Sequence, residues 1–257
     1  MSLPLTNKKV LVTREESQAK QFSDLLLIRG AVPIEVPLLK IDCISVKEQL
    51  SKINFQQVEW IFFTSAHGVR CFFRQLDDRS IMEHCNIATV GHKTELALKK
   101  FNLSADFIPT TYNAQVMAKE FLETYPNANN LLLIRGNISR KDLIEAFTEN
   151  EITFGTLTVY ETNFHEEIKG KFIQTLNEHQ FDFLTFTSPS TVQAFRSFVK
   201  DEGNIEQFLQ IPTVCIGTTT EKYALQAGFK YTFTPTSFTI ESMVEKMEEI
   251  VHMEGLT

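Results

Sequence analysis

The stretch Phe63–Phe72, FTSAHGVRCF, decides the fold because it returns 123 residues later as Phe186–Phe195, FTSPSTVQAF. Three further matches occur at shifts of 121 to 126 residues, and all four matches have the same order in the two copies. They are Val12-Thr13-Arg14 with Leu133-Ile134-Arg135, Val90-Gly91-x-x-Thr94 with Ile216-Gly217-x-x-Thr220, and Pro109 with Pro235. A period of about 120 residues is too long for the repeats of a solenoid. Each copy therefore has the size of a domain.

The local patterns between these matches indicate the fold class. Short runs of β-branched and aromatic residues alternate with helical patterns of about ten to fifteen residues, which is typical of βαβ units around a parallel sheet. In the first helical pattern, the apolar residues from Ala19 to Leu26 share one face, and Gly30 is expected to end the helix. The closing segment Glu241–Glu254 is expected to be an amphipathic helix. The expected strands are Lys9–Thr13, Trp60–Thr64, Asn86–Val90, Leu131–Arg135, Asp182–Thr187 and Pro212–Ile216.

The hexapeptide LLLIRG occurs twice, at Leu25–Gly30 and at Leu131–Gly136. The two copies are 106 residues apart and out of register with the repeat. We interpret the first as part of a helical apolar face and the second as a buried strand, because a short apolar run cannot be assigned by itself.

Two segments do not resemble buried parallel strands. Val32–Asp42 contains two prolines, and Ile152–Thr162 alternates Thr with apolar residues, so both resemble edge or linker strands. Each follows the first βα unit of its repeat. If both cross over, that unit belongs to the lobe built mainly by the other repeat, and the cleft between the lobes is a natural ligand site. The expected lobes are residues 1–36 with 163–257, and residues 37–162 including the linker strands.

Length and composition limit the class of protein. The 257 residues allow one large domain or two small ones. With 43% hydrophobic and 22% charged residues, the chain is not disordered, collagen-like or fibrous. Only 10 residues are glycine, and none are spaced as G-x-G-x-x-G or G-x-x-x-x-G-K-[ST]. The usual sequence evidence for a dinucleotide or nucleoside triphosphate site is therefore absent.

Charge and cysteine usage indicate the setting. A formal net charge of −7 disfavours sequence-independent binding of nucleic acid. Cys43, Cys71, Cys85 and Cys215 show no C-x-x-C spacing, so we expect four free thiols in a reducing compartment. The N-terminus has no apolar signal-peptide region, and no apolar run approaches the roughly 18 residues that cross a bilayer. We expect a cytoplasmic protein that binds neither nucleic acid nor membranes.

Hydroxyl side chains follow the expected strands where helices begin. Thr64 and Ser65, with Thr187, Ser188 and Ser190 in the second repeat, offer hydroxyl and backbone N–H groups suited to anions. Ser and Thr often only cap helices. Two copies facing one cleft nevertheless favour binding, because parallel α/β sheets bind ligands beyond the carboxyl ends of their strands.

Glycines and arginines at other strand ends extend this set. A glycine allows a ligand to approach the backbone closely, and an arginine can bind a carboxylate through two N–H groups. A solvated arginine at a strand end is an equally good interpretation. These residues are Gly91 with Thr94, Gly217 with Thr220, Arg14 and Arg135.

Tyr160 lies on the second linker segment, beside Glu161. It is interpreted equally well as an amphipathic edge residue and as a ligand contact at a domain interface. The six histidines form no H-E-x-x-H, and His84 beside Cys85 lacks further ligands at zinc spacing. There is no G-x-S-x-G nucleophile elbow. We therefore expect no dedicated metal site and no lipase-like serine.

Eight stretches in order carry a resemblance to a known family: Leu11–Arg14, Phe62–Val69, Val90–Thr94, Tyr112–Ala114, Ile134–Asn137, Val159–Thr162, Phe186–Val192, and Ile216-Gly217 with Thr220. Together they resemble the uroporphyrinogen-III synthase family from near the N-terminus to about residue 243. No single stretch is specific, but their order and spacing are. His67 stands where the family often has Asn, and Phe238 where Tyr is usual, so neither is a candidate site residue.

The resemblance implies an α/β fold of two flavodoxin-like lobes with parallel sheets, joined by a two-stranded antiparallel linker. It implies that the chain closes linear hydroxymethylbilane to uroporphyrinogen III, with inversion of ring D and loss of water, through an azafulvene cation and a spiro-pyrrolenine. It implies no cofactor. We expect a monomer that serves tetrapyrrole biosynthesis and receives the bilane by transient hand-over from hydroxymethylbilane synthase.

The substrate of that reaction bears carboxylates on every ring while the protein is net negative, so local donors must bind it. We expect Tyr160 to be the catalytic residue, orienting the terminal ring or hydrogen-bonding to the departing hydroxyl, because a phenol with a reference pKa of about 10 is a weak acid near neutrality. The substrate-binding residues expected from the motifs and the resemblance are Arg14, Thr64, Ser65, Gly91, Thr94, Arg135, Gly136, Asn137, Thr187, Ser188, Ser190, Gly217 and Thr220.

Two other classes of protein remain open. A non-catalytic two-lobed binder of an anionic small molecule would share the hinge, the repeat and the hydroxyl-rich turns. Binding of uroporphyrinogen without turnover of bilane would favour it. A signalling module of flavodoxin-like domains is the weaker alternative, because the first strand ends in Thr13-Arg14 without an acidic pair for a phosphoryl-accepting Asp.

Overall fold

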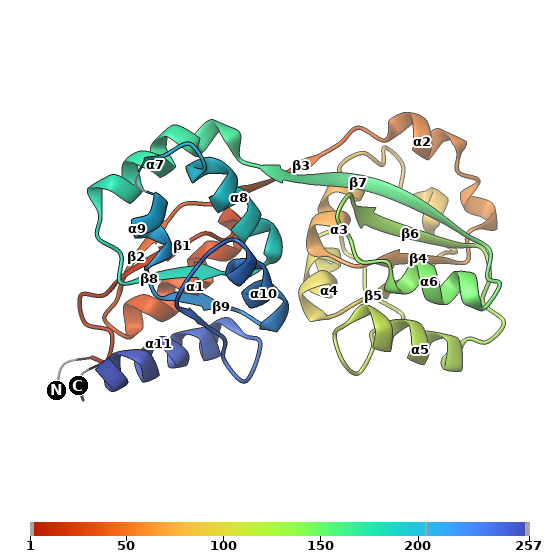
Figure 1. Ribbon diagram of the computed structural model, residues 1–257. Helices are drawn as coiled ribbons and strands as arrows, with labels where there is room; N and C mark the ends of the chain where they lie inside the picture. The colour runs from red at the N-terminus through yellow and green to blue at the C-terminus, as the bar shows by residue number, and fades with distance from the viewer. Residues whose placement is uncertain (1–2, 204, 255–257) are drawn as a thin grey trace. The chain divides into compact units, whose positions relative to one another are not determined.

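The computed structural model of this protein describes residues 3–203 and 205–254 (Figure 1). The chain divides into two compact units, of which unit 1 contains Met1–Lys40 and Asn163–Thr257 and unit 2 contains Ile41–Thr162. Both divisions fall inside strands, namely β3 (Leu39–Cys43) and β7 (Phe154–Phe164). Unit 1 therefore combines two segments that are far apart in the sequence, whereas unit 2 is one continuous segment.

Unit 1 is built around a five-stranded sheet in the order β10-β9-β8-β1-β2, in which all neighbouring strands are parallel. The strands are β1 (Lys9–Val12), β2 (Val32–Glu35), β8 (Phe183–Phe186), β9 (Thr213–Cys215) and β10 (Thr232–Phe233). The helices are α1 (Glu16–Ile28), α7 (Lys169–Glu178), α8 (Pro189–Val199), α9 (Ile205–Leu209), α10 (Thr218–Gln226) and α11 (Ile240–Glu254), with a short 3-10 helix at Glu166–Ile168.

The core of unit 1 follows from the alternation of side chains along its strands. Val10 and Val12 of β1 pack with Phe22 of α1 on one face of the sheet. Leu11, which lies between them, packs with Phe195 of α8 on the other face. Because both faces are covered, the inner strands β1, β8 and β9 are buried almost throughout, whereas the outer strands β2 and β10 are partly exposed.

Unit 2 has a second five-stranded sheet, in the order β3-β7-β6-β4-β5. Its remaining strands are β4 (Trp60–Phe63), β5 (Asn86–Thr89) and β6 (Leu131–Gly136). Its helices are α2 (Lys47–Lys52), α3 (Ala66–Phe73), α4 (His92–Lys99), α5 (Ala114–Thr124) and α6 (Asp142–Glu149), with short 3-10 helices at Phe55–Gln57 and Ser80–Met82. Alternation again divides the core, because Phe62 packs with α5 and α6 whereas Phe63 packs with α3.

The strands β4, β5, β6 and β7 form parallel pairs, but β3 runs antiparallel to β7. The Ile44 N–H donates to the Val159 carbonyl at 3.1 Å, and the His165 N–H donates to the Leu38 carbonyl at 2.9 Å. As one chain advances from Leu38 to Ile44, its partner recedes from His165 to Val159. The pair β3–β7 is therefore antiparallel, whereas the other strand pairs described above are parallel.

The two sheets share a pattern of neighbours. In unit 1, β1 lies between β8 and β2, and in unit 2, β6 lies between β4 and β7. Each of these two strands, β1 and β6, thus has on one side the next strand along the chain, and on the other a strand from the opposite half of the sequence. Within each sheet, the carboxyl ends of these parallel strands all lie at the same end of the sheet.

The expected α/β class is confirmed, and each of the six expected strands is present with ends that differ by at most one residue. Gly30 ends the first helix with a φ of +86°, a conformation that favours glycine. The segment Val32–Asp42 holds two strands, of which β2 is an edge strand where proline is tolerated. The segment from residue 152 forms β7, which is flanked by β6 and β3 and is not an edge strand.

The expectation of four free thiols is wrong for one pair. Cys43 at the end of β3 and Cys71 in α3 form a disulfide, with their Cα atoms 5.3 Å apart. The pairing depends on the packing of α3 beside the end of β3, which a spacing of 28 residues does not reveal. Cys85 and Cys215 are free and buried, and burial raises the pKa of these thiols to about 11 and about 12.

No helix within the described residues is both long and apolar enough to span a membrane.

Candidate functional site

A cavity of about 370 Å³ lies in unit 2 at the carboxyl ends of its parallel strands. Thr64 and Ser65 follow β4, Arg135 is the penultimate residue of β6, and Tyr160 is in β7. Parallel α/β sheets bind ligands at this edge. The remaining lining residues are Val90, Tyr112, Asn113, Ala114, Leu133, Ile138, Ser139, Arg140 and Leu143.

The Tyr160 hydroxyl is held in place by Ser65. The Ser65 hydroxyl donates to the Tyr160 hydroxyl at 3.0 Å and accepts the backbone N–H of Gly68 at 3.0 Å. The second bond is the N-cap of α3. Since the one proton of Ser65 is directed to Tyr160, the phenolic proton of Tyr160 is available to another acceptor.

The Tyr160 ring is fixed from its other side by Gly136. A Cβ atom on Gly136 would lie 2.4 Å from two ring carbons of Tyr160, so only glycine leaves room for the ring there. The N–H of Asn137 donates to the Tyr160 carbonyl at 3.2 Å, and the N–H of Gly136 donates to the Ser139 hydroxyl at 2.9 Å. Tyr160 is consequently only 8% exposed although it lines the cavity.

Arg135 is tied to the turn that follows β6. Its Nε donates to the Gly136 carbonyl at 3.3 Å and its Nη2 to the Ser139 carbonyl at 3.1 Å. Within the described part of the chain, its Nη1 makes no hydrogen bond. The guanidinium is therefore held in one orientation while retaining N–H groups for an acidic ligand.

The other sequence-predicted residues of unit 2 support the cavity without lining it. Gly91 is the N-cap of α4, and Thr94 is buried in its first turn, where its N–H donates to the Gly91 carbonyl. The Asn137 side chain accepts the backbone N–H groups of Ile138 and Thr162, each at 2.9 Å. These residues shape the backbone around the cavity.

Several lining residues were missed by the reasoning from sequence. Arg140 forms an ion pair with Asp142 at the start of α6, at 2.7 Å between Nε and Oδ2. The Asn113 side chain caps α5 by accepting the Val116 N–H at 2.8 Å. Two signals point to these residues, because Asn113 belongs to a family-matching stretch and Arg140 follows the turn after Arg135.

The remaining predicted residues belong to unit 1. Ser188 caps α8 by accepting the Thr191 N–H at 3.3 Å, and Thr220 is buried in the first turn of α10, which Gly217 caps. Burial lowers the pKa of the Arg14 guanidinium, and the charges of Glu15 and Glu241 partly offset this. The six unit 1 residues, none of which lines the unit 2 cavity, are Arg14, Thr187, Ser188, Ser190, Gly217 and Thr220.

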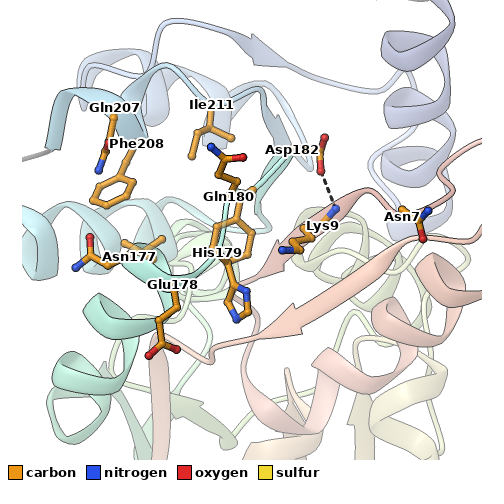
Figure 2. Close-up of a pocket in the computed structure, with 12 residues that line it drawn as sticks. Asn7, Lys9, Asn177, Glu178, His179, Gln180, Asp182, Gln207, Phe208 and Ile211 are labelled. Carbon is orange, nitrogen blue, oxygen red and sulfur yellow. Dashed lines mark hydrogen bonds between the residues drawn. The ribbon is translucent and has the colours of Figure 1, made fainter.

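A larger cavity, of about 760 Å³, lies in unit 1 at the amino ends of its strands, opposite the end where parallel sheets bind ligands (Figure 2). Lys9 begins β1 and Asp182 immediately precedes β8, so the cavity lies at the amino ends of the strands. Asp182 accepts the Lys9 N–H at 2.8 Å (Figure 2). Asp182 also accepts a hydrogen bond from the Lys8 ammonium at 2.9 Å, and the two bonds hold this end of the sheet together. No sequence-predicted site residue lines this cavity, and the unit 2 cavity is therefore the candidate site.

The comparisons with known proteins identify the family. A model of the family described as "Uroporphyrinogen-III synthase HemD" matches residues 20–245. The chain belongs to the uroporphyrinogen-III synthase family. Within this family, it is 30% identical over 256 residues to the porphyrin biosynthesis protein HemD of Ruminiclostridium josui, covering 97% of this chain and 50% of that protein. The chain thus spans about half the length of that relative.

Other members of the uroporphyrinogen-III synthase family match along their full length. The chain is 27% identical over 249 residues to the uroporphyrinogen-III synthase of Chlorobaculum parvum, covering 94% of this chain and 98% of that protein. Its fold is similar to that of the Helicobacter pylori uroporphyrinogen-III synthetase, with a TM-score of 0.65, 15% identity and coverage of 95% and 100%. A mutant Thermus thermophilus uroporphyrinogen III synthase gives a TM-score of 0.60 at 18% identity, with coverage of 96% and 100%.

Within the described residues, no group of three or more His, Cys, Asp and Glu side chains is placed to hold a metal ion. The unit 2 cavity is lined by a phenol and a serine hydroxyl that are hydrogen-bonded to each other, and by an oriented guanidinium. This arrangement can bind a carboxylate and donate a hydrogen bond to a leaving oxygen.

Proposed function

We propose that this chain closes linear hydroxymethylbilane to uroporphyrinogen III, with inversion of ring D and loss of water, as a cyclising hydro-lyase of tetrapyrrole biosynthesis. The observation that carries the proposal is the Ser65–Tyr160 contact in a cavity at the carboxyl ends of the strands, in a chain of this family. The end product that it serves is haem, sirohaem or cobalamin.

Tyr160 is proposed to act on the leaving group. Loss of the terminal hydroxyl of the bilane is favoured by a hydrogen bond to the departing oxygen. Because the Tyr160 hydroxyl accepts a hydrogen bond from the Ser65 hydroxyl, its own proton is available for that oxygen. Ring packing against Gly136 supports this role, since it limits the directions in which the phenol can point.

Substrate carboxylates are proposed to bind through local donors, because the chain has a net charge of −7. In unit 2, Arg135 supplies guanidinium N–H groups and Thr64 supplies a hydroxyl beside the same cavity. Ser65, whose hydroxyl proton is directed to Tyr160, is proposed to bind substrate by way of that phenol. Gly91, Thr94, Gly136 and Asn137 support the backbone of this site. The proposed binding residues of unit 1 are Arg14, Thr187, Ser188, Ser190, Gly217 and Thr220.

The main contribution to catalysis is proposed to be orientation. Free hydroxymethylbilane closes spontaneously to the symmetric isomer I. To form isomer III, the protein must hold the terminal ring so that its substituted carbon attacks the azafulvene first. Orientation of reacting groups is worth roughly 7 to 11 kcal/mol in favourable cases. No cofactor is required for this chemistry.

We propose that each unit is a flavodoxin-like lobe. Counted along the chain within unit 1, the order β2-β1-β8-β9-β10 corresponds to the 2-1-3-4-5 order of flavodoxin-like sheets. The order β7-β6-β4-β5 in unit 2 has the same pattern of neighbours. The antiparallel strands β3 and β7, which contain both divisions of the chain, are proposed to be the linker.

We further propose that the protein acts as a cytoplasmic monomer and receives its substrate by transient hand-over from hydroxymethylbilane synthase. The spontaneous closure of free bilane supports a short transfer, because released substrate is lost to isomer I.

One assay tests the function. Freshly generated hydroxymethylbilane is added to the protein, the products are oxidised, and isomers I and III are separated. We expect isomer III to dominate, at a rate above that of the protein-free control. Isomer I alone, formed at the spontaneous rate, would reject the synthase assignment, and binding of uroporphyrinogen III without turnover would indicate a binding protein.

A further inference from the structure

An exposed aromatic ring lies against the N-cap glycine of α4. The side chain of Tyr112 is 55% exposed, and a Cβ atom on Gly91 would lie 2.8 Å from its Cγ. The ring therefore rests directly on the Gly91 backbone, and it contacts the His92 ring in an edge-to-face arrangement with the ring centroids 5.2 Å apart. Tyr112 also lines the unit 2 cavity that contains Tyr160.

The same arrangement occurs in unit 1. Phe238 follows Tyr112 by 126 residues, which is the shift that relates Gly217 to Gly91. A Cβ atom on Gly217 would lie 3.2 to 3.4 Å from three carbons of the Phe238 ring, and the Phe238 side chain is 60% exposed. Each unit thus holds an exposed ring on the glycine that caps a helix at the carboxyl edge of its sheet.

A single exposed aromatic residue needs no explanation. Here an exposed aromatic ring is present at equivalent positions of both repeats, and each packs against a residue without a side chain. This packing limits the movement of each ring while more than half of the residue remains exposed. Such a ring is suited to contact a flat apolar group of a ligand.

The surroundings of Tyr112 indicate what kind of ligand would fit. Ile138 is 58% exposed and lines the same cavity, so a second apolar side chain is left open there. Arg135 and Arg140 line that cavity as well. Exposed apolar surface beside two guanidinium groups matches a flat aromatic ring that carries carboxylates at its edge.

We propose that Tyr112 in unit 2 and Phe238 in unit 1 are pyrrole-contacting residues, each presenting its exposed surface to one ring of the bilane and of the product. The inference rests on the proposed function and adds to it two residues that position substrate. Gly91 and Gly217 act through these rings, because any larger residue would displace them. The rings contribute to the choice of isomer by limiting the orientations of the pyrroles.

The test compares Tyr112→Leu and Phe238→Leu with the wild type, by KM and kcat for hydroxymethylbilane, by the ratio of isomer III to isomer I, and by the Kd for uroporphyrinogen III. We expect each Leu variant to raise KM and Kd by about 2- to 12-fold, the range that corresponds to loss of one aromatic pair. We also expect a larger share of isomer I. Tyr112→Phe retains the ring and is expected to lie closer to the wild type than Tyr112→Leu.

Tyr231→Leu is the matched control, because Tyr231 is 54% exposed and is not part of the proposed binding residues. It is expected to retain the wild-type KM and isomer ratio. Gly91→Ala keeps Tyr112 but forces its ring to move, and is expected to raise KM as Tyr112→Leu does. Thermal unfolding of all variants separates binding effects from loss of fold.

The outcomes distinguish the two proposals. If the wild type produces only isomer I at the spontaneous rate, the synthase function itself is wrong. If the wild type produces isomer III and both Leu variants match it in KM, Kd and isomer ratio, the pyrrole contact alone is overturned. A rise in KM for Tyr231→Leu equal to that of the other variants would also overturn it.

Discussion

The Ser65 hydroxyl donates a 3.0 Å hydrogen bond to the Tyr160 hydroxyl and at the same time caps α3. One side chain therefore stabilises a helix terminus and orients the phenol of the candidate site. Its repeat equivalent Ser188 caps α8 in unit 1. Both serines cap a helix, and Ser65 also donates to a tyrosine. Comparing variants of the two serines therefore separates the effect of the cap from the effect of the tyrosine contact.

Ser65→Ala is expected to lower both stability and kcat. Loss of an N-cap costs about 0.5 to 2 kcal/mol, and loss of the phenol contact removes a further orienting bond worth about 0.5 to 1.5 kcal/mol. We expect kcat to fall by about 10-fold. Ser188→Ala should lose similar stability and less kcat, as measured by urea unfolding and by the isomer III assay. Equal kcat in the two variants would contradict the role assigned to Ser65.

Tyr160→Phe removes the hydroxyl while keeping the ring that packs on Gly136. We expect kcat to fall at least about 10-fold, which corresponds to about 1.4 kcal/mol of the barrier, with KM little changed. The assay is the initial rate of isomer III formation from fresh bilane. A kcat within about twofold of the wild type would show that the hydroxyl does not act on the leaving group.

Gly136→Ala places a Cβ atom 2.4 Å from the Tyr160 ring, so the ring must move. Overpacking of this kind costs about 1 to 3 kcal/mol. We expect both a lower free energy of unfolding and a kcat at or below that of Tyr160→Phe. Gly170→Ala is the matched control, because nothing lies within 4 Å of a Cβ atom at Gly170. Wild-type kcat in Gly136→Ala would indicate that the position of the ring is not important.

Much of the fold was predictable because periodicity and context are local properties of the sequence. The hexapeptide LLLIRG is helical at Leu25 and forms strand β6 at Leu131–Gly136, as the neighbouring patterns predict. Leu26 is fully buried on its helical face, and Leu133 is buried with 2% exposure on a strand. Identical residues thus adopt different structures according to the periods around them.

The disulfide and part of the cavity were not predictable, because they depend on tertiary packing. Cys43 and Cys71 meet only once α3 packs beside the end of β3. Thr64, Ser65, Arg135 and Tyr160 line the cavity as strand-end positions suggest. Arg140 was missed since its place depends on the turn between β6 and α6, which no strand or helix pattern defines.

Reduction of the disulfide is expected to lower stability. The bond closes a loop of 28 residues, for which chain entropy gives about 3 to 4 kcal/mol. We expect dithiothreitol to lower the urea midpoint of the wild type. Cys43→Ser should show the lower midpoint without reductant and no further change with it, because Cys43 is exposed and little packing is lost. An unchanged midpoint in the reduced wild type would contradict the contribution assigned to the bond.

The buried thiols give a pH-dependent prediction. Burial raises the pKa of Cys85 to about 11 and that of Cys215 to about 12, so their thiolate forms are scarce at pH 8. We expect neither thiol to react with an aromatic disulfide reagent in the native protein at pH 8. Two thiols should react after unfolding without reductant, and four after unfolding with reduction and removal of the reductant.

The same shifts determine the sign of the effect on stability. A raised pKa in the folded state means that the folded protein retains its protons to higher pH than the unfolded chain. The stabilising effect is therefore complete below the ordinary cysteine pKa of about 8.5 and is lost as pH rises toward the folded values. We expect the free energy of unfolding to fall between about pH 9 and pH 11, and to fall less in Cys215→Ala, whose lower starting stability is measured at pH 7. An equal decline in that variant would assign the alkaline loss of stability to other groups.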